Sequence, residues 1–206
     1  MKRYFPITVV LLLFLGMGAC SPATPIPEKP TPTVQPIPTQ PYYPLTTATG
    51  VQVIDQVLNA VARGDSQNLL SLVEFFEAKC TQQSGLGGPP KCREAEAEGT
   101  PVEVLAFIGS EGGHLRKDEL ENGLRIKATG VYTVYEVNTA VVSSEQYYPV
   151  GNYVIVFVNE GEHAATALRI GESGIVRIDE ILDSSPESLR AMVEREASKV
   201  ILAPKA

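Results

Sequence analysis

Residues 151–182, GNYVIVFVNEGEHAATALRIGESGIVRIDEIL, carry the strongest structural signal in the chain. Runs rich in strand-forming residues at 151–159, 163–170 and 175–182 are separated by short segments that contain glycine. This spacing predicts consecutive β-hairpins. In the first run both faces are apolar, so we expect a central strand covered on both sides. In the second run Arg169 and His163 alternate with apolar residues, which predicts that one face meets solvent.

Helical patterns lie before and after these strands. Residues 51–63 predict a helix that ends at Gly64 and buries Ile54, Val57, Leu58 and Val61. Asp65 can cap a second short helix with the apolar stripe Leu69, Leu72, Val73 and Phe76. Ser185 and Pro186 indicate the start of a last helix.

The remaining segments complete the predicted order. Residues 102–108 predict a strand, 115–124 a short surface helix, and 125–137 the first strand of the meander. The order is therefore helix, helix, strand, helix, four antiparallel strands and a tail helix.

This order, over about residues 48–182, resembles the cystatin-like roll of the nuclear-transport-factor-2-like superfamily. The resemblance implies an α+β fold, in which a curved antiparallel sheet packs on the N-terminal helices and encloses a cone-shaped cavity. It also implies that a homodimer can form through the open sheet face. The alternative fold is an α+β sheet with helices on one face.

The first 20 residues have the layout of an export signal. Lys2 and Arg3 precede the apolar run 7–15, which ends in small residues before Cys20. Gly18-Ala19-Cys20 resembles the lipobox of bacterial lipoproteins, although Met17 stands where that pattern usually has leucine. The resemblance implies that residues 1–19 are removed and that Cys20 carries a diacylglyceryl lipid and palmitate. An ordinary secretory signal and an uncleaved anchor are the alternatives.

A proline-rich linker follows the predicted lipidation site. Nine of the 16 prolines lie between residues 22 and 45, a density that favours an extended polyproline II spacer. A proline-rich docking ligand and a glycosylated stalk are the alternatives. We expect the linker to cover residues 20–47 and one folded domain to cover residues 48–206, held on the extracytoplasmic side of a cell-envelope membrane.

The composition of the chain limits the classes of molecule that the protein can bind. The formal charge of −7 argues against nucleic acid, because binding phosphates needs a positive surface. The expected partners are the membrane, through the N-terminal lipid, and either a small-molecule ligand or another envelope protein.

The two other cysteines enclose a glycine- and proline-rich loop. Because an exported protein meets an oxidising compartment, we expect Cys80 and Cys92 to form a disulfide rather than a metal site. The loop is either a fixed lid or recognition loop at the mouth of a cavity, or a structural connection between a helix and a strand that binds no ligand. Its sequence, with Gly85-Leu86-Gly87-Gly88-Pro89-Pro90-Lys91, resembles a signature of uncharacterised envelope lipoproteins, which implies no activity. The acidic run 94–98 reads as a solvated face.

Candidate catalytic residues are few. Arg177 and Asp179 share one face of their strand, and an inward pair could bind a polar ligand, whereas an outward pair would be a surface ion pair. His114 follows two glycines in an expected exposed loop and is a candidate base. Tyr132 and Tyr135 should lie on opposite faces, so only one could line a cavity. No motif predicts a metal or a cofactor. We expect a non-catalytic binding or interaction module, with a small-molecule isomerase or dehydratase in the cone cavity as the alternative.

Overall fold

The computed structural model describes residues 42–109, 112–142, 145–159 and 161–205; the predicted signal peptide, Cys20 and the linker up to residue 41 lie outside them. The fold is α+β, as expected. In chain order the elements are α1 (Gln52–Arg63), α2 (Ser66–Ser71), β1 (Phe76–Lys79), β2 (Pro101–Ile108), β3 (Gly113–Arg116), η1 (Lys117–Leu120), β4 (Gly130–Val137), β5 (Tyr153–Val158), β6 (Ala165–Ile170), β7 (Ile175–Ile181), α3 (Pro186–Glu196) and β8 (Ala197–Leu202).

The junction between α1 and α2 forms as predicted. Gly64 ends α1 in the left-handed conformation, with φ 63°, which glycine adopts without steric cost. The Asp65 side chain then caps α2 by accepting a hydrogen bond of 3.0 Å from the Asn68 amide. The predicted second helix is too long, however. Phe76 already belongs to β1, because the chain after α2 turns to run along the sheet.

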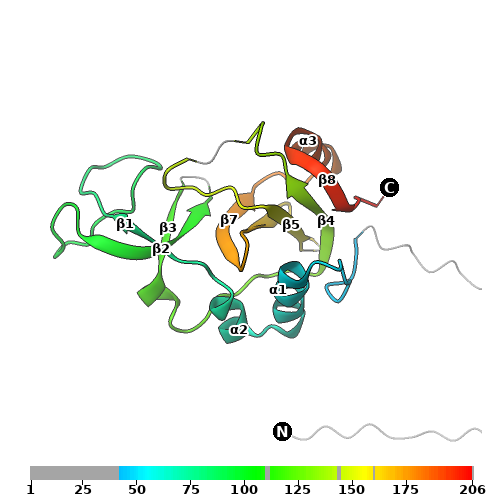
Figure 1. The fold of residues 1–206 in the computed structure, drawn as a ribbon, viewed down its shortest axis with the longest axis horizontal. Coiled ribbons are helices and arrows are strands. Elements are labelled where there is room, and N and C mark those ends of the chain that lie inside the picture. Colours follow the sequence, from blue (N-terminus) through cyan, green and yellow to red (C-terminus); the bar gives the residue numbers. More distant parts are fainter. Residues whose placement is uncertain (1–41, 110–111, 143–144, 160, 206) are drawn as a thin grey trace, which may run out of the picture. The chain divides into compact units, whose positions relative to one another are not determined.

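The strands form one mixed sheet. Its order is β1-β2-β7-β6-β5-β4-β8, and β3 pairs with β2 (Figure 1). The predicted antiparallel meander from β4 to β7 is present. The prediction of a wholly antiparallel sheet was wrong, because β7 runs beside β2 in the same direction.

Three segments differ from the predicted elements. The expected surface helix over 115–124 is mostly another structure: Gly113–Arg116 forms β3, and only Lys117–Leu120 is helical, as one 3₁₀ turn. Residues 124–129 form a strap without regular structure before β4, in which Leu124 and Ile126 pack on the core. β8 was not predicted; it follows α3 directly and pairs with β4.

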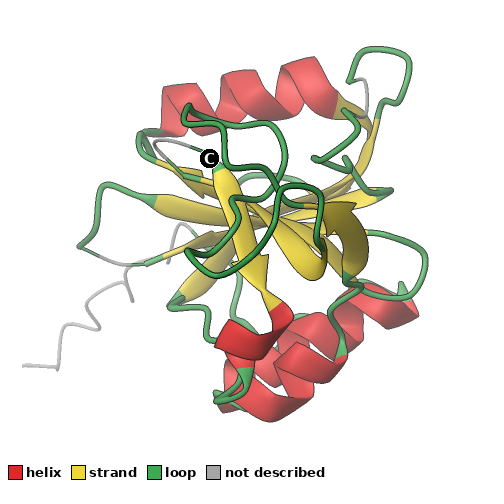
Figure 2. Cartoon of the chain, turned by 90° about the vertical axis from the view of Figure 1, so that its left-hand side faces the viewer, coloured by secondary structure: helices red, strands yellow, loops and turns green. Residues whose placement is uncertain are grey.

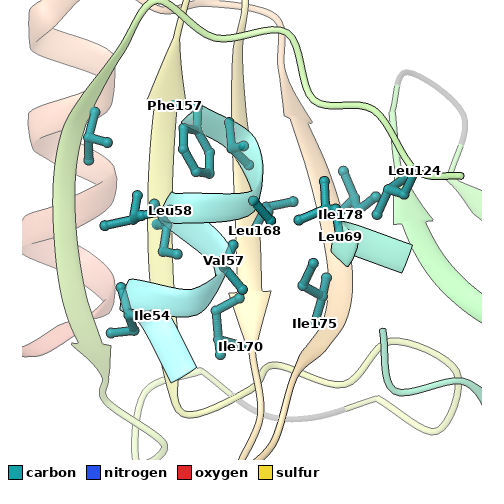
Figure 3. Close-up of a cluster of buried hydrophobic side chains, with 14 of the residues drawn as sticks. Ile54, Val57, Leu58, Leu69, Leu124, Phe157, Leu168, Ile170, Ile175 and Ile178 are labelled. Carbon is teal, nitrogen blue, oxygen red and sulfur yellow. The ribbon is translucent and has the colours of Figure 1, made fainter. Parts of the chain in front are cut away.

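Each face of the sheet has its own apolar core. Figure 2 shows helices on both sides of the strands. On one side α1 packs Ile54, Val57 and Leu58 against the sheet (Figure 3). On the other side Leu189 and Val193 of α3 pack on the face that the resemblance leaves open. β5 is therefore covered on both faces, as predicted.

The folded body begins before the predicted boundary at residue 48. Tyr43 pairs with Val131 of β4 through two backbone hydrogen bonds of 2.8 and 2.9 Å, and its hydroxyl donates to the Ala203 carbonyl at 2.9 Å. Among the described residues, no helix has the length and apolar character needed to cross a membrane.

Candidate functional site

Arg177 and Asp179 do lie on one face of β7, and both are largely buried. Their side chains pair directly, with 2.6 Å between Arg177 Nε and Asp179 Oδ1. Ile178, between them in sequence, belongs to the core under α1, so the pair points to the α3 side. The pair of Arg177 and Asp179 is thus directed into the protein, on the face of the sheet that α3 covers and not on the face that α1 covers.

Arg169 joins this pair to the last helix. Its Nε donates to Asp179 Oδ2 at 2.6 Å, and its Nη2 donates to Glu196 Oε2 at 2.8 Å. The prediction that Arg169 meets solvent was wrong, because α3 covers it and leaves it 4% exposed. The Tyr135 hydroxyl donates to Glu196 at 3.2 Å. We call Arg169, Arg177, Asp179, Glu196 and Tyr135 the buried network.

Each carboxylate of the buried network lies against arginines, whereas Arg169 Nη1 has no hydrogen-bond partner among the described residues. Burial alone would raise the pKa of Glu196, but hydrogen bonds and attraction from Arg195 and Arg169 outweigh it and lower that pKa. Burial, with the nearby Glu196 carboxylate, raises the pKa of Tyr135. Asp179 accepts hydrogen bonds from both Arg169 and Arg177, so its carboxylate oxygens are already occupied and it is poorly placed to act as a base.

A bulge in β4 explains why both tyrosines lie on the α3 side. The register of β4 against β5 shifts between Val131 and Thr133. This shift removes the simple alternation of faces, so that Tyr132 and Tyr135 enter the same apolar cluster. The prediction that they point to opposite faces was wrong for that reason.

His114 is half-buried in β3 rather than in an exposed loop. Its Nε2 lies 3.1 Å from the Tyr147 carbonyl oxygen, and its ring centroid lies 5.2 Å from that of Tyr148. Burial lowers the pKa of His114. Arg177 Nη1 donates to the Tyr148 carbonyl at 3.3 Å, so the backbone of residues 147–148 separates His114 from Arg177. The three catalytic candidates are neighbours, but they do not converge on one cavity.

The predicted disulfide between Cys80 and Cys92 is present, with an S–S distance of 2.03 Å. It closes a loop that lies against β3 and Tyr148, whose hydroxyl is 3.5 Å from the Gly88 carbonyl oxygen. Among the described residues, Cys80, Cys92 and Glu96 are the one group of three metal-type ligands that lie together. Because both sulfurs are in the disulfide, they offer no thiolate to a metal.

The acidic run after the loop is more than a solvated face. Glu96 forms an ion pair with Arg116 of β3, with 2.6 Å between Oε1 and Nη1, and Arg116 also donates to the Lys91 carbonyl at 2.7 Å. The Arg116 side chain and the Arg93 amide donate to this carboxylate and lower the pKa of Glu96 from its usual 4.5 to about 2. Glu96 therefore fastens the loop to the sheet, as a structural connection and a fixed lid would both require.

A pocket of about 340 Å³ lies on the α1 side of the sheet, where β5, β6 and β7 approach the 124–129 strap. Phe157, Thr166 and Glu180 are paired residues on β5, β6 and β7, so their side chains project from the same face. Phe157, Leu124 and Ile178, seen in Figure 3, form part of its apolar wall. Half-buried Phe107, Leu115 and Ile126 complete that wall.

This pocket was not predicted, although the sequence holds two signals of it. Glu180 follows Asp179 on the same strand, and the period of two directs it to the opposite face, into the pocket. Arg125 and Lys127 line the mouth from the strap, which had been assigned to a strand. Their alternation with buried Leu124 and half-buried Ile126 is the pattern that could have identified them.

Comparison of the chain with protein-family models, with curated proteins and with solved structures gave no match.

Proposed function

We propose that this protein is a lipid-anchored lipoprotein of the cell envelope, whose nuclear-transport-factor-2-like domain is a non-catalytic binding module. The N-terminal sequence supports the anchor, through the charged start, the apolar run and Gly18-Ala19-Cys20. The Cys80–Cys92 disulfide supports export, because such bonds persist in oxidising compartments. Two helices followed by a meander whose α1 side forms a pocket support the roll fold.

One observation favours binding over catalysis: the catalytic candidates and the pocket are separate. Arg177 and Asp179 point to the α3 side and are engaged with each other and with Arg169. His114 lies beside the disulfide loop, and none of the three residues lines the pocket. An isomerase or dehydratase needs a proton acceptor within hydrogen-bond reach of its substrate. The two carboxylates that do line the pocket, Glu162 and Glu180, are exposed to solvent, whereas a catalytic base is usually desolvated beside its substrate. The mostly apolar pocket is therefore better suited to holding a ligand than to moving a proton.

The anchor is tested on the full-length chain, expressed in bacteria fed with labelled palmitate. We expect the wild-type protein to carry the label and to sediment with membranes. Cys20→Ser should lose both properties, because it removes the only thiol at the lipobox. Cys92→Ser is the matched control, since it removes a thiol elsewhere and should keep the label. A labelled Cys20→Ser variant, or unlabelled wild-type protein, would contradict the proposal.

The binding role is tested by native mass spectrometry of the chain from Ser21 onward, exported through a cleavable secretory signal. This chain retains every contact described above, all of which lie within residues 42–205. We expect a co-purified small molecule on the wild-type chain. Thr166→Trp should lose it, because the indole would fill the pocket. Equal adducts on both chains would show that the ligand binds elsewhere.

A further inference from the structure

The pocket beside β6 has the size and lining for a small ligand with an apolar body. One water molecule occupies about 30 Å³ in the liquid. If each non-hydrogen atom of a ligand takes about that space, the pocket holds about ten such atoms. Phe107 contributes a half-buried aromatic ring to the wall. Glycine at position 109 leaves that ring its space: a Cβ there would lie 2.9 Å from the Phe107 ring and 3.1 Å from Glu180 Oε2. An aromatic group on the ligand would gain ring–ring contacts there.

Charges of both signs surround the mouth of this pocket. Arg125 and Lys127 come from the strap, whereas Glu180 comes from the end of β7 and Glu162 from the turn between β5 and β6. Within the part of the chain that the structure describes, these four side chains form no ion pair within 4.0 Å. Opposite charges in contact would pair, so the cations and the carboxylates remain apart around one mouth. A ligand that bears both charges could complement them together.

We propose that the pocket binds a small zwitterion with an apolar, aromatic body, of the size of an aromatic amino acid. The ligand carboxylate contacts Arg125 and Lys127, its ammonium group contacts Glu180, and its ring lies on Phe107 beside Thr166. This inference rests on the proposed binding function and names the ligand class of the same site.

Three probes with one phenyl body separate the contributions: L-phenylalanine, 3-phenylpropanoate, which lacks the ammonium group, and 2-phenylethylamine, which lacks the carboxylate. They are titrated calorimetrically into the chain from Ser21 onward. We expect L-phenylalanine to bind at least about tenfold more tightly than either analogue, as the loss of a charged hydrogen bond predicts.

Variants then assign each contact. Glu180→Gln should weaken L-phenylalanine about tenfold and leave 3-phenylpropanoate unchanged. Arg125→Gln with Lys127→Gln should weaken the two carboxylate probes and leave 2-phenylethylamine unchanged. Thr166→Trp should abolish binding of all three. Glu77→Gln, an exposed carboxylate on β1, is the control and should bind like wild type. Thermal unfolding verifies that each variant is folded.

Several results would overturn the inference. Equal binding of L-phenylalanine and 3-phenylpropanoate would exclude the zwitterion while leaving the binding module standing. Unchanged affinity in Thr166→Trp would place the ligand outside this pocket. If no probe binds but native mass spectrometry still finds an adduct that Thr166→Trp loses, the ligand class is wrong and the proposed function survives. If both the probes and the adduct are absent, both proposals fail.

Discussion

Arg169 of β6 and Glu196 at the end of α3 lie 27 residues apart in sequence and are joined by an ion pair of 2.8 Å, inside the protein. The two side chains are only 5% and 8% exposed. Because β8 follows α3 without a loop, this pair fixes both the last helix and the last strand on the sheet.

Removing one charge from this pair should therefore lower the stability of the folded protein. We expect Glu196→Gln to lower the free energy of unfolding by about 3–5 kcal/mol, because it leaves Arg169 buried with one carboxylate fewer. Lys199→Gln is the control: its pair with Glu136 is exposed and should contribute less than about 1 kcal/mol. Urea unfolding monitored by circular dichroism measures both. Equal midpoints for Glu196→Gln and wild type would show that the pair does not hold α3.

The ion pair between Glu96 and Arg116 should make the stability of the protein depend on pH in the acid range. The pKa of Glu96 falls from 4.5 to about 2 on folding, chiefly because Arg116 donates to its carboxylate. The folded state thus binds this proton more weakly than the unfolded chain does. The contribution of Glu96 is complete above pH 4.5 and is lost as the pH falls toward 2.

The measurement is the urea midpoint of unfolding at pH 7, 4, 3 and 2. Glu96→Gln should be less stable than wild type at pH 7, and its midpoint should fall less between pH 4 and pH 2. Glu94→Gln changes the charge equally without touching Arg116 and should follow the wild-type profile. Parallel profiles for Glu96→Gln and wild type would exclude this role.

The disulfide should stabilise mainly by restricting the unfolded chain. For a loop with a sequence separation of 12, we expect Cys80→Ala with Cys92→Ala to cost about 3 kcal/mol. Intact mass spectrometry of the exported wild-type chain should show a mass two hydrogens below that of the reduced chain. A reducing agent should lower the wild-type stability to that of the double variant and leave the double variant unchanged. Stability unaffected by reductant would contradict this account.

Packing of α1 on the sheet gives a further matched comparison. Ile54 is 0% exposed, so Ile54→Ala should cost about 2–5 kcal/mol through lost burial and a cavity. Leu86 in the disulfide loop is 74% exposed, and Leu86→Ala should change stability by less than about 0.5 kcal/mol. Chemical denaturation of the two variants compares them. A loss below 1 kcal/mol for Ile54→Ala would mean that α1 packs less tightly than described.

The local parts of the fold could be predicted because local physics determines them. Gly64 ends α1 because glycine adopts the left-handed conformation easily, and Asp65 caps α2. The strands of the meander can be recognised from their apolar residues. β3 escaped prediction because it has only four residues and adjoins a charged run that indicated a surface helix, and β8 because it follows α3 directly and its partner β4 lies far away in sequence. That partner cannot be deduced from the residues of β8 itself.

The candidate site was predicted only in part, for a related reason. Arg177 and Asp179 were expected to share a face, and they do, but only the position of α3 decides which core that face belongs to. Arg169 looked solvent-exposed because charge alternating with apolar residues usually indicates a wet face. Its partner Glu196 lies in another element, so no local pattern could reveal the pair.

The place where the chain enters the folded body has a mechanical consequence. Tyr43 is held to Val131 by two backbone hydrogen bonds beside Ala203, next to the end of β8. A force along the predicted linker would first load the bond from Lys205 to the Tyr42 carbonyl and the two bonds between Tyr43 and Val131. We expect these bonds to break while the cores on both faces of the sheet remain intact. The linker would then lengthen by a few residues under tension, and the domain would stay folded.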